Sequence, residues 1–473
     1  MGLRKAVVAG SFYPKDKEEL RNQIKRFLEE ARVPEVSGKL RVLILPHAGY
    51  LFSGKVAGFG FKLLSEKLNG IKRVILIGPS HHYPVINKIV ADGNELWETP
   101  LGKVKVDREF IQGLIEREKL FEVNSRFHLP EHCLEVEIPF LQVILEDFKI
   151  VPLLVSELGE RELQRASETL AENMAKDTLL ITSSDMSHYP PYEEAIYADK
   201  KVISAILSKK VKKLEDTLKE LERENILGAD TFLCGETAVK IGMKVAEFLE
   251  AQNATLLKYA NSGDSIFGDK SQVVGYCAVS FSGEREGNEL IEKEKEILLK
   301  IAKTSIETFL KTGRIPKFQE ELFFLNRKWG AFVTLKKQGR LRGCIGTFTP
   351  TKIPLYEVVS QMAISAAVKD GRFFPVTVDE LDDLEYEISV LGPLRKIKNW
   401  REIKLGKEGV LIKAGIRSGV FLPQVAIENN WDLETFLSEL CYFKVGLERD
   451  CYKREDVELY VFDTQVFSQK DLK

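Results

Sequence analysis

Four continuous apolar runs in the N-terminal part of the chain constrain its fold more than any other feature. They read RVLILP (41–46), KRVILIGPS (72–80), KIVPLLV (149–155) and DTLLITSSD (177–185). Strands that face solvent on one side alternate apolar and polar residues, whereas strands buried on both faces of a parallel sheet are apolar throughout. Helical patterns separate the runs, as in residues 16–31, where Leu20, Ile24, Phe27 and Leu28 share one face. The sequence therefore predicts an α/β domain with a mostly parallel sheet and flanking helices.

A second domain with a different architecture is expected downstream. The segment SGEREGNE (282–289) is polar and follows a β-like run, VVGYCAVSF (273–281). It precedes an amphipathic helical pattern marked by Ile297, Ile301 and Ile306. Beyond this helix, strand-like runs such as GAFVTLKK (330–337) cluster with few crossover helices, which is typical of an α+β domain with an antiparallel sheet. We predict domains at 1–281 and 290–473, joined by a linker at 282–289.

The composition and the residue patterns argue against several classes of partner and compartment. Lys and Arg (69) nearly balance Asp and Glu (71), so the charge gives no support for a nucleic-acid or anionic-membrane partner. The chain shows neither the apolar core of a signal peptide nor a run long enough to span a membrane. Its six cysteines form no CxxC pair, which argues against a zinc ribbon or a disulfide framework. We expect a cytoplasmic protein with reduced thiols.

The histidines are confined to the predicted first domain, at positions 47, 81, 82, 128, 132 and 188. The segment GYLFSGK (49–55) has the spacing of a phosphate-binding loop, but Val56 replaces the Ser or Thr that holds magnesium. The histidines offer a different explanation, because three of the apolar runs are each followed by His within a few residues: His47, His81 with His82, and Asp185 with His188. Ligand sites in open α/β sheets form at the carboxyl ends of strands. We therefore expect these groups to converge on one site.

The residue types in this predicted site favour a metal. Imidazole suits iron, copper and zinc, and two histidines with one further ligand leave positions open for substrate or dioxygen. Cys234, in LCGETAV, is the candidate third ligand, although an inert buried cysteine is the alternative. Pro130 lies between His128 and His132 and argues against both ligating from one helical face. We place His132 in the wall of the site.

Residues 4–281 resemble the Memo family. The resemblance rests on an ordered series of motifs: GSFYP, PHAGYLFSG, GPSHH, ETPLGKVKVD, EHCLEVEIPFLQ, SSDMSHY and LCGETAV. Memo proteins are similar in fold to class III extradiol dioxygenases, which use non-haem iron. The resemblance implies that His47, His81 and Cys234 bind the metal, while Asp185 and His188 occupy the acid/base region. A cysteine would replace the carboxylate of the extradiol enzymes, and a thiolate changes the potential of iron and also suits copper.

The chemistry implied is redox or dioxygenase-like, with Fe(II) as the expected metal and Cu or Zn as alternatives. In this interpretation His188, oriented by Asp185, moves a proton during turnover of a small molecule or peptide. Two other interpretations stay open. One is a non-catalytic scaffold that binds peptides or proteins, and the other is a metal-dependent hydrolase, which would need zinc and a carboxylate base.

The second domain is similar to the AMMECR family. The segment GRLRGCIGTFTP (339–350) contains that family's LRGCIG motif, and RFFPVTVDELDDLEYEISVLGPL (372–394) extends the resemblance. Within the motif, Cys344 lies between glycines with Arg342 nearby, so a guanidinium could lower the thiol pKa. The alternative is a small residue packed in a strand. AMMECR-like and Memo-like domains often accompany a radical-SAM protein, which implies a shared pathway in which this domain presents substrate or partner.

Overall fold

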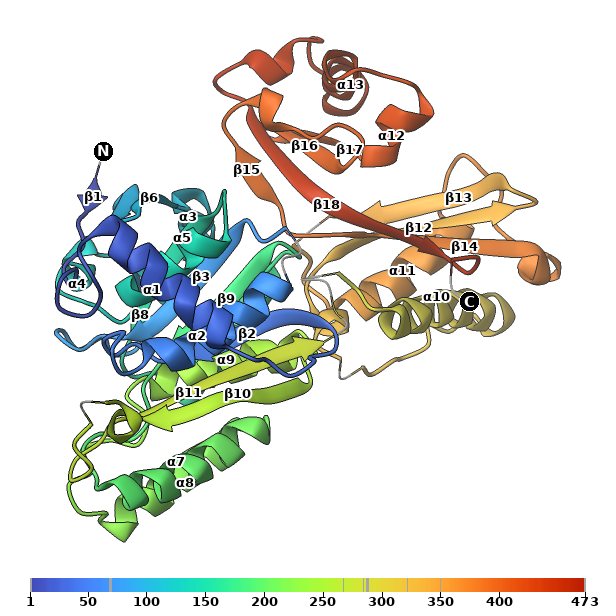
Figure 1. Cartoon of the computed structure of the whole chain (residues 1–473). Helices are drawn as coiled ribbons and strands as arrows, with labels where there is room; N and C mark the ends of the chain where they lie inside the picture. The colour runs from blue at the N-terminus through green and yellow to red at the C-terminus, as the bar shows by residue number, and fades with distance from the viewer. Residues whose placement is uncertain are drawn as a thin grey trace. The chain divides into compact units, whose positions relative to one another are not determined.

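The computed structural model describes residues 2–67, 70–266, 268–283, 285, 289–320, 322–348 and 350–471. Its chain divides into two compact units, Met1–Glu289 and Leu290–Lys473, which Figure 1 shows in one view. The helix after the boundary, α10, covers Glu292–Thr312. Ser282 and Gly283 of the predicted linker belong to strand β11 (Gly275–Gly283), while residues 284 and 286–288 lie outside the described part of the chain.

The four apolar runs form the centre of a mixed eleven-stranded sheet in the N-terminal unit. They correspond to β2 (Lys39–Leu45), β3 (Arg73–Pro79), β8 (Lys149–Val155) and β9 (Thr178–Ser183). Their order in the sheet is β8-β3-β9-β2, and every neighbouring pair is parallel. The predicted buried parallel core is confirmed, and the sheet becomes mixed because antiparallel pairs flank this core.

The flanking strands complete this sheet on both sides. Two antiparallel pairs, β5 with β6 and β10 with β11, lie towards its edges, and β11 also pairs antiparallel with β2. The bounds of the remaining strands are β1 (Leu3–Arg4), β4 (Ile89–Ala91), β5 (Leu96–Thr99), β6 (Gly102–Val106), β7 (Phe121–Val123) and β10 (Asn253–Asn261).

Helices cover both faces of the sheet (Figure 1). A Cβ added at Gly60 of α2 would lie 2.3 Å from Leu45, and one at Gly242 of α9 would lie 3.3 Å from Val42. Leu45 and Val42 are an odd number of residues apart on β2, so their side chains point to opposite faces. The helices of this unit are α1 (Lys17–Glu30), α2 (Gly54–Glu66), α3 (Arg108–Arg117), α4 (Ser125–His128), α5 (Ile138–Ile144), α6 (Glu160–Asn173), α7 (Tyr192–Leu207), α8 (Val211–Glu224) and α9 (Glu236–Phe248).

Helix α1 shows how local sequence sets these boundaries. The Asp16 side chain accepts hydrogen bonds from the backbone N–H groups of Glu18 and Glu19, which satisfies two donors that a helix start leaves free. Leu20 and Ile24 of the predicted apolar face are buried. The predicted helix at 16–31 is therefore confirmed, with Asp16 as its cap.

The C-terminal unit is built on a seven-stranded antiparallel sheet, as predicted. Its order is β13-β12-β14-β18-β16-β17, with β15 paired to β18. The β12–β13 hairpin turns at Gln338 and Gly339, which both have positive φ, as the favoured two-residue hairpin turns require. The strands are β12 (Gly330–Lys337), β13 (Arg340–Thr347), β14 (Leu384–Leu391), β15 (Arg395–Ile397), β16 (Glu408–Ala414), β17 (Arg417–Phe421) and β18 (Glu458–Ser468).

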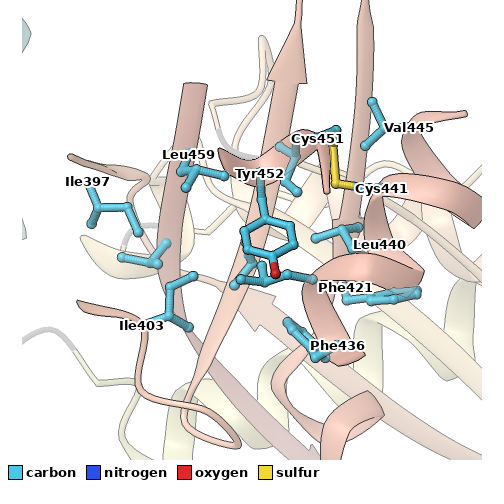
Figure 2. Close-up of a cluster of buried hydrophobic side chains, with 14 of the residues drawn as sticks. Ile397, Ile403, Phe421, Phe436, Leu440, Cys441, Val445, Cys451, Tyr452 and Leu459 are labelled. Atoms are coloured by element: carbon cyan, nitrogen blue, oxygen red, sulfur yellow. A yellow bond between two sulfur atoms is a disulfide. The ribbon is translucent and has the colours of Figure 1, made fainter. Parts of the chain in front are cut away.

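The long strand β18 joins two parts of this unit. Its first half pairs with β16, and its second half, Thr464–Ser468, pairs with β14. Helices α10 and α11 (Leu355–Val368) pack beside each other on the β12–β14 side. The other part contains α12 (Pro423–Glu428) and α13 (Leu433–Glu439), and it encloses a buried apolar cluster in which Phe421, Phe436, Leu440 and Tyr452 lie close together (Figure 2).

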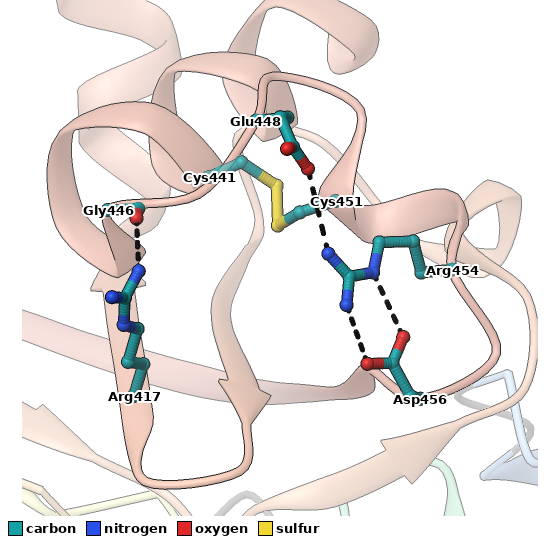
Figure 3. The surroundings of a disulfide bond; sticks show 7 residues. All are labelled: Arg417, Cys441, Gly446, Glu448, Cys451, Arg454 and Asp456. Atoms are coloured by element: carbon teal, nitrogen blue, oxygen red, sulfur yellow. Dashed lines mark hydrogen bonds and ion pairs between the residues drawn. A yellow bond between two sulfur atoms is a disulfide. The ribbon is translucent and has the colours of Figure 1, made fainter.

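A disulfide between Cys441 and Cys451 lies within this cluster, so the prediction that all six cysteines are reduced thiols is wrong. The two residues are ten apart in sequence, and both are fully buried. Figure 3 shows polar contacts around the loop that they close, including the Arg417 guanidinium donating to the Gly446 carbonyl. Cys133, Cys234, Cys277 and Cys344 are free thiols. No CxxC spacing marks the bonded pair, because the chain fold brings the two cysteines together.

Membrane insertion gains no support from the helices. Across the described ranges, none of them combines the length and the apolar character that crossing a bilayer requires.

Replacing both Cys441 and Cys451 with Ser should lower the free energy of unfolding of the C-terminal unit by about 2–3 kcal/mol, because a short loop is no longer closed in the unfolded chain. Denaturant unfolding followed by tryptophan fluorescence measures this, since Trp400 and Trp431 pack against the cluster. A Cys344→Ser variant is the control. Equal midpoints for the double variant and the parent protein would contradict the prediction.

Candidate metal centre

The carboxyl ends of three adjacent parallel strands bring the predicted site residues together. His47 follows β2, His81 follows β3 and Asp185 follows β9, each by two residues. Because β9 lies between β2 and β3, these strand ends are neighbours. The imidazole centroids of His47 and His81 are 5.2 Å apart. The site therefore lies where open α/β sheets place their ligands.

His132 joins this pair, whereas the sequence suggested only a place in the wall of the site. Its ring lies 4.8 Å from that of His81 and 5.5 Å from that of His47. One nitrogen from each of the three imidazoles falls within 4.8 Å of the others. His47 is buried, His132 is partly exposed and His81 is exposed. The cluster can thus supply three nitrogen ligands and has an accessible side.

Cys234 contacts the same histidine, His47. Its Sγ is 3.3 Å from His47 Nε2, and it accepts a hydrogen bond from the backbone N–H of Asp185. Cys234 lies two residues before α9, and the intervening N-cap residue, Gly235, packs against Ser184. His47 is therefore in contact with the thiol predicted as the third ligand, and it also belongs to the three-imidazole group.

Glu131 orients the cluster, and the sequence analysis did not give it this role. One carboxylate oxygen accepts from His81 Nδ1 at 2.9 Å, and the other accepts from the His81 backbone N–H at 2.7 Å. The backbone N–H groups of His132 and Cys133 donate to the same carboxylate. With Nδ1 of His81 carrying the proton, Nε2 keeps its lone pair for a metal, which is the usual carboxylate–histidine arrangement. In the sequence, the only sign of this role for Glu131 was its position next to His132 in the EHC segment (131–133).

The electrostatics favour the neutral form of His47 and His132, and neutral imidazole is the form that binds metals. Burial, followed by the nearby His81 and His132, lowers the pKa of His47 well below its usual value. Burial also lowers the pKa of His132 to about 4. Burial alone would raise the pKa of Glu131, but the hydrogen bonds from His81 outweigh it and hold the carboxylate ionised. Near pH 7 His47 and His132 are therefore neutral nitrogen donors, and the ionised Glu131 carboxylate adds one negative charge to the site.

The Cys234 thiol behaves differently. Burial and the charge of Asp185 raise its pKa to about 12, so it is protonated at neutral pH. A cysteine binds metal as the thiolate, and binding therefore releases a proton. The donor set of imidazoles with one thiol fits iron, copper or zinc, and does not fit magnesium or calcium, which prefer oxygen ligands.

Asp185 and His188 share a loop, but the carboxylate does not contact the imidazole in the way we predicted. Asp185 accepts a hydrogen bond from the backbone N–H of His47, and burial raises its pKa to about 7. His188 Nδ1 instead contacts the carbonyl oxygen of Met186 at 3.0 Å. A carbonyl can only accept, so Nδ1 carries the proton and Nε2 is the acceptor in the neutral ring. Met186, and not Asp185, orients this histidine.

The remaining histidines lie outside the cluster. His82 is exposed, although its charge still influences the pKa of His132. His128 is buried at the end of α4, where its Nε2 lies 2.9 Å from the Val90 carbonyl oxygen. The structure thus separates His128 from His132, as Pro130 suggested.

Arg342 and Cys344 lie on β13 of the C-terminal unit. Arg342 binds the Glu380 carboxylate through two nitrogens, at 3.1 and 2.9 Å, and donates to the Phe374 carbonyl. This brace holds the pKa of Glu380 at about 2. The Cys344 thiol accepts from the Thr334 hydroxyl, and the Arg372 guanidinium donates to the Cys344 carbonyl. These contacts give Arg342 a structural role in place of the predicted activation of the Cys344 thiol.

A Glu131→Gln variant should bind Fe(II) or Zn(II) about 10- to 100-fold more weakly than the parent protein, because the amide no longer orients His81 as a carboxylate does. Competition titration with a chromophoric chelator measures the affinity. Glu122→Gln, at a half-exposed glutamate whose ion partner is Lys88, is the matched control. Unchanged affinity in the Glu131 variant would show that His81 does not depend on this contact.

Comparison with known proteins agrees with the division of the chain. The sequence matches the Memo-like protein family over residues 4–280 and the AMMECR1 family over residues 299–467. A MEMO1 family protein of Ignicoccus hospitalis is 35% identical over 295 residues, which cover 59% of this chain and 99% of the relative. One from Methanosarcina mazei is 36% identical over 285 residues, with the same coverage of each chain.

Among solved structures, an uncharacterized protein from Pyrococcus horikoshii is 41% identical and matches 37% of this chain and 91% of its own, with a TM-score of 0.35. The curated relatives correspond in extent to the unit that carries the imidazole cluster. The chain therefore belongs to the Memo-like protein family and carries an AMMECR1 domain after its Memo-like domain.

Proposed function

We propose that the N-terminal unit contains a mononuclear metal site with Fe(II) as its metal. At this site the protein would carry out redox, dioxygenase-like chemistry on an organic substrate. The observation that supports it is the convergence of three imidazoles and one thiol, with His47 and His81 supplied by the ends of adjacent strands. When bound, the metal would supply electron transfer and activation of dioxygen. His47 and His81 would hold it, with Cys234 or His132 as the third ligand.

The protein's own residues orient the imidazole rings and supply a proton acceptor. Glu131 fixes the tautomer of His81, and Ser183 contacts His47 Nδ1 at 3.0 Å, so both rings are oriented before any metal binds. His188 presents Nε2 as a proton acceptor, because Nδ1 is engaged by the Met186 carbonyl. Its burial lowers its pKa, which keeps it neutral and able to accept a proton near pH 7.

The cluster leaves room for a substrate on one side. His81 and His132 retain 31% and 20% of their side-chain exposure, while His47 retains 2%. A buried ligand with exposed partners is the arrangement expected of a site that binds a molecule from solution. A small organic molecule or a peptide side chain is the corresponding class of substrate.

A second candidate, a metal-dependent hydrolase, is favoured by one observation. Three imidazoles within 4.8 Å of one another match the ligand set of some catalytic zinc sites. Asp185, with a pKa raised to about 7, would be the carboxylate that such a reaction needs. The two candidates differ in their metal and in whether Cys234 or His132 is the third ligand.

Metal analysis of anaerobically purified protein tests the proposal. We expect close to one equivalent of iron, which is lost in the His47→Ala and His81→Ala variants and kept in His82→Ala, an exposed histidine outside the group. The iron-loaded protein should consume dioxygen in the presence of ascorbate.

Zinc in place of iron, with hydrolysis of 4-nitrophenyl acetate that depends on His132, would favour the hydrolase. Failure of the native protein to retain or take up any of these metals would contradict both candidates and leave the peptide-binding scaffold.

A further inference from the structure

We propose that Glu137 is held as a neutral carboxylic acid and that, through a hydrogen bond to Ser183, it sets the tautomer of His47. The inference rests on the proposed function and deepens it, because it adds a positioning residue to the same metal site. It is carried by the number of hydrogen bonds that the Ser183 hydroxyl can make and by the burial of the groups around it.

The Ser183 hydroxyl, at the end of β9, has three polar neighbours. Its Oγ lies 2.7 Å from the Cys133 carbonyl oxygen, 3.0 Å from His47 Nδ1 and 3.0 Å from a carboxyl oxygen of Glu137. A hydroxyl group has one proton to donate and two lone pairs that accept. Three hydrogen bonds therefore use its full capacity.

One arrangement of protons satisfies all three contacts. The Cys133 carbonyl can only accept, so it takes the proton of the Ser183 hydroxyl. The two other neighbours must then donate to the lone pairs of Ser183. His47 donates from Nδ1, which leaves the lone pair of Nε2 for a metal. Glu137 can donate only as the neutral acid, because a carboxylate carries no proton.

Burial makes this count of protons binding on the structure. Ser183, Glu137, His47 and Cys133 are all buried. A Cβ added at Gly78 of β3 would lie only 3.4 Å from the Ser183 Cβ, so the neighbouring strand packs closely against this serine. A buried polar group without a hydrogen-bond partner is costly. The arrangement that pairs every group is therefore the favoured one.

Glu137 differs from the two other buried glutamates of its segment. Glu131 accepts from several N–H groups, and Glu135 is paired with Arg4. Such donors stabilise the ionised form. Among the residues that the structure describes, the Glu137 carboxyl has the Ser183 hydroxyl as its hydrogen-bond partner and forms no ion pair. Burial accordingly raises the pKa of Glu137 well above its usual value.

The neutral state matters for the tautomer of His47. An ionised Glu137 would compete with the Cys133 carbonyl for the single proton of Ser183, and one of the two acceptors would lose its partner. Without any donor at position 137, the Ser183 hydroxyl could turn its proton towards His47 Nδ1 and stabilise the opposite tautomer. Glu131 thus orients His81 as an acceptor, whereas Glu137 orients His47 as a donor acting through Ser183.

Infrared spectroscopy of metal-free full-length protein, with a ¹³C label in the glutamate carboxyl groups, tests the protonation state. The variants are Glu137→Gln, which keeps a neutral donor, and Glu137→Leu, which removes it. Near pH 7 we expect the parent spectrum to contain the C=O band of a protonated glutamic acid that both variants lack. Spectra without this difference would show that Glu137 is ionised, and the inference would be overturned.

Nitrogen NMR of histidine-labelled, metal-free protein tests the effect on His47, whose signals are assigned by their loss in His47→Ala. We expect the Nδ1–H tautomer in the parent and Gln proteins and a mixture of tautomers in the Leu protein. The same tautomer in all three proteins would contradict the positioning role. If the Leu variant does not fold, the infrared difference of the Gln variant decides the inference.

A titration with Zn(II) connects this position to the metal site. The Leu variant should bind zinc about tenfold more weakly than the parent, and the Gln variant should restore the parent affinity, in contrast to the loss expected for Glu131→Gln. Equal losses in the Gln and Leu variants would overturn the inference. A parent protein that takes up no metal would contradict the proposed function alone, because the infrared and NMR measurements contain no metal.

Discussion

The candidate metal centre depends on one buried ion pair between Arg4 and Glu135. Both side chains are fully buried, with the guanidinium 2.7 Å from the carboxylate. Arg4 also donates to the carbonyl oxygens of His128 and Glu131 and lies over the ring of Trp97. Glu135 accepts from the Tyr13 hydroxyl and from backbone N–H groups of the N-terminal segment. Strand β1 is thereby fixed to the loop that carries Glu131 and His132.

The Arg4–Glu135 ion pair matters more for the position of the 128–135 loop than for the stability of the fold. Burying two charges costs about as much as their attraction returns, so such a pair is weak evidence for net stabilisation. Its hydrogen bonds nevertheless fix the 128–135 loop, and Glu131 in turn fixes the tautomer of His81. The order of the imidazoles therefore rests on a network that joins Arg4 to His128 and Glu135, which are 124 and 131 residues away in sequence.

The parts of the fold that followed from the sequence are those governed by short-range patterns. The apolar runs identified β2, β3, β8 and β9 because residues buried on both faces of a strand leave no alternation. The position of His47, His81 and Asp185 just beyond those runs predicted their convergence, since parallel strands end at one edge of a sheet.

The features that could not be predicted from the sequence depend on long-range contacts. Apart from its position next to His132, nothing local distinguishes Glu131 from other acidic residues until Arg4 and His81 are placed beside it. His188 binds the Met186 carbonyl because of the backbone path of its own loop, which residue types do not reveal. Likewise, the disulfide between Cys441 and Cys451 reflects packing around the α13 region. These are tertiary arrangements, and they decide the chemistry of the site more than the motifs do.

The central claim is that histidine nitrogens at the ends of β2 and β3 bind one metal. X-ray absorption at the iron edge of anaerobically reconstituted protein tests it most directly. The account predicts scattering from at least two imidazoles, with one sulfur neighbour if Cys234 is the third ligand and none if His132 is. An iron environment of oxygen atoms alone, without imidazole scattering, would contradict it.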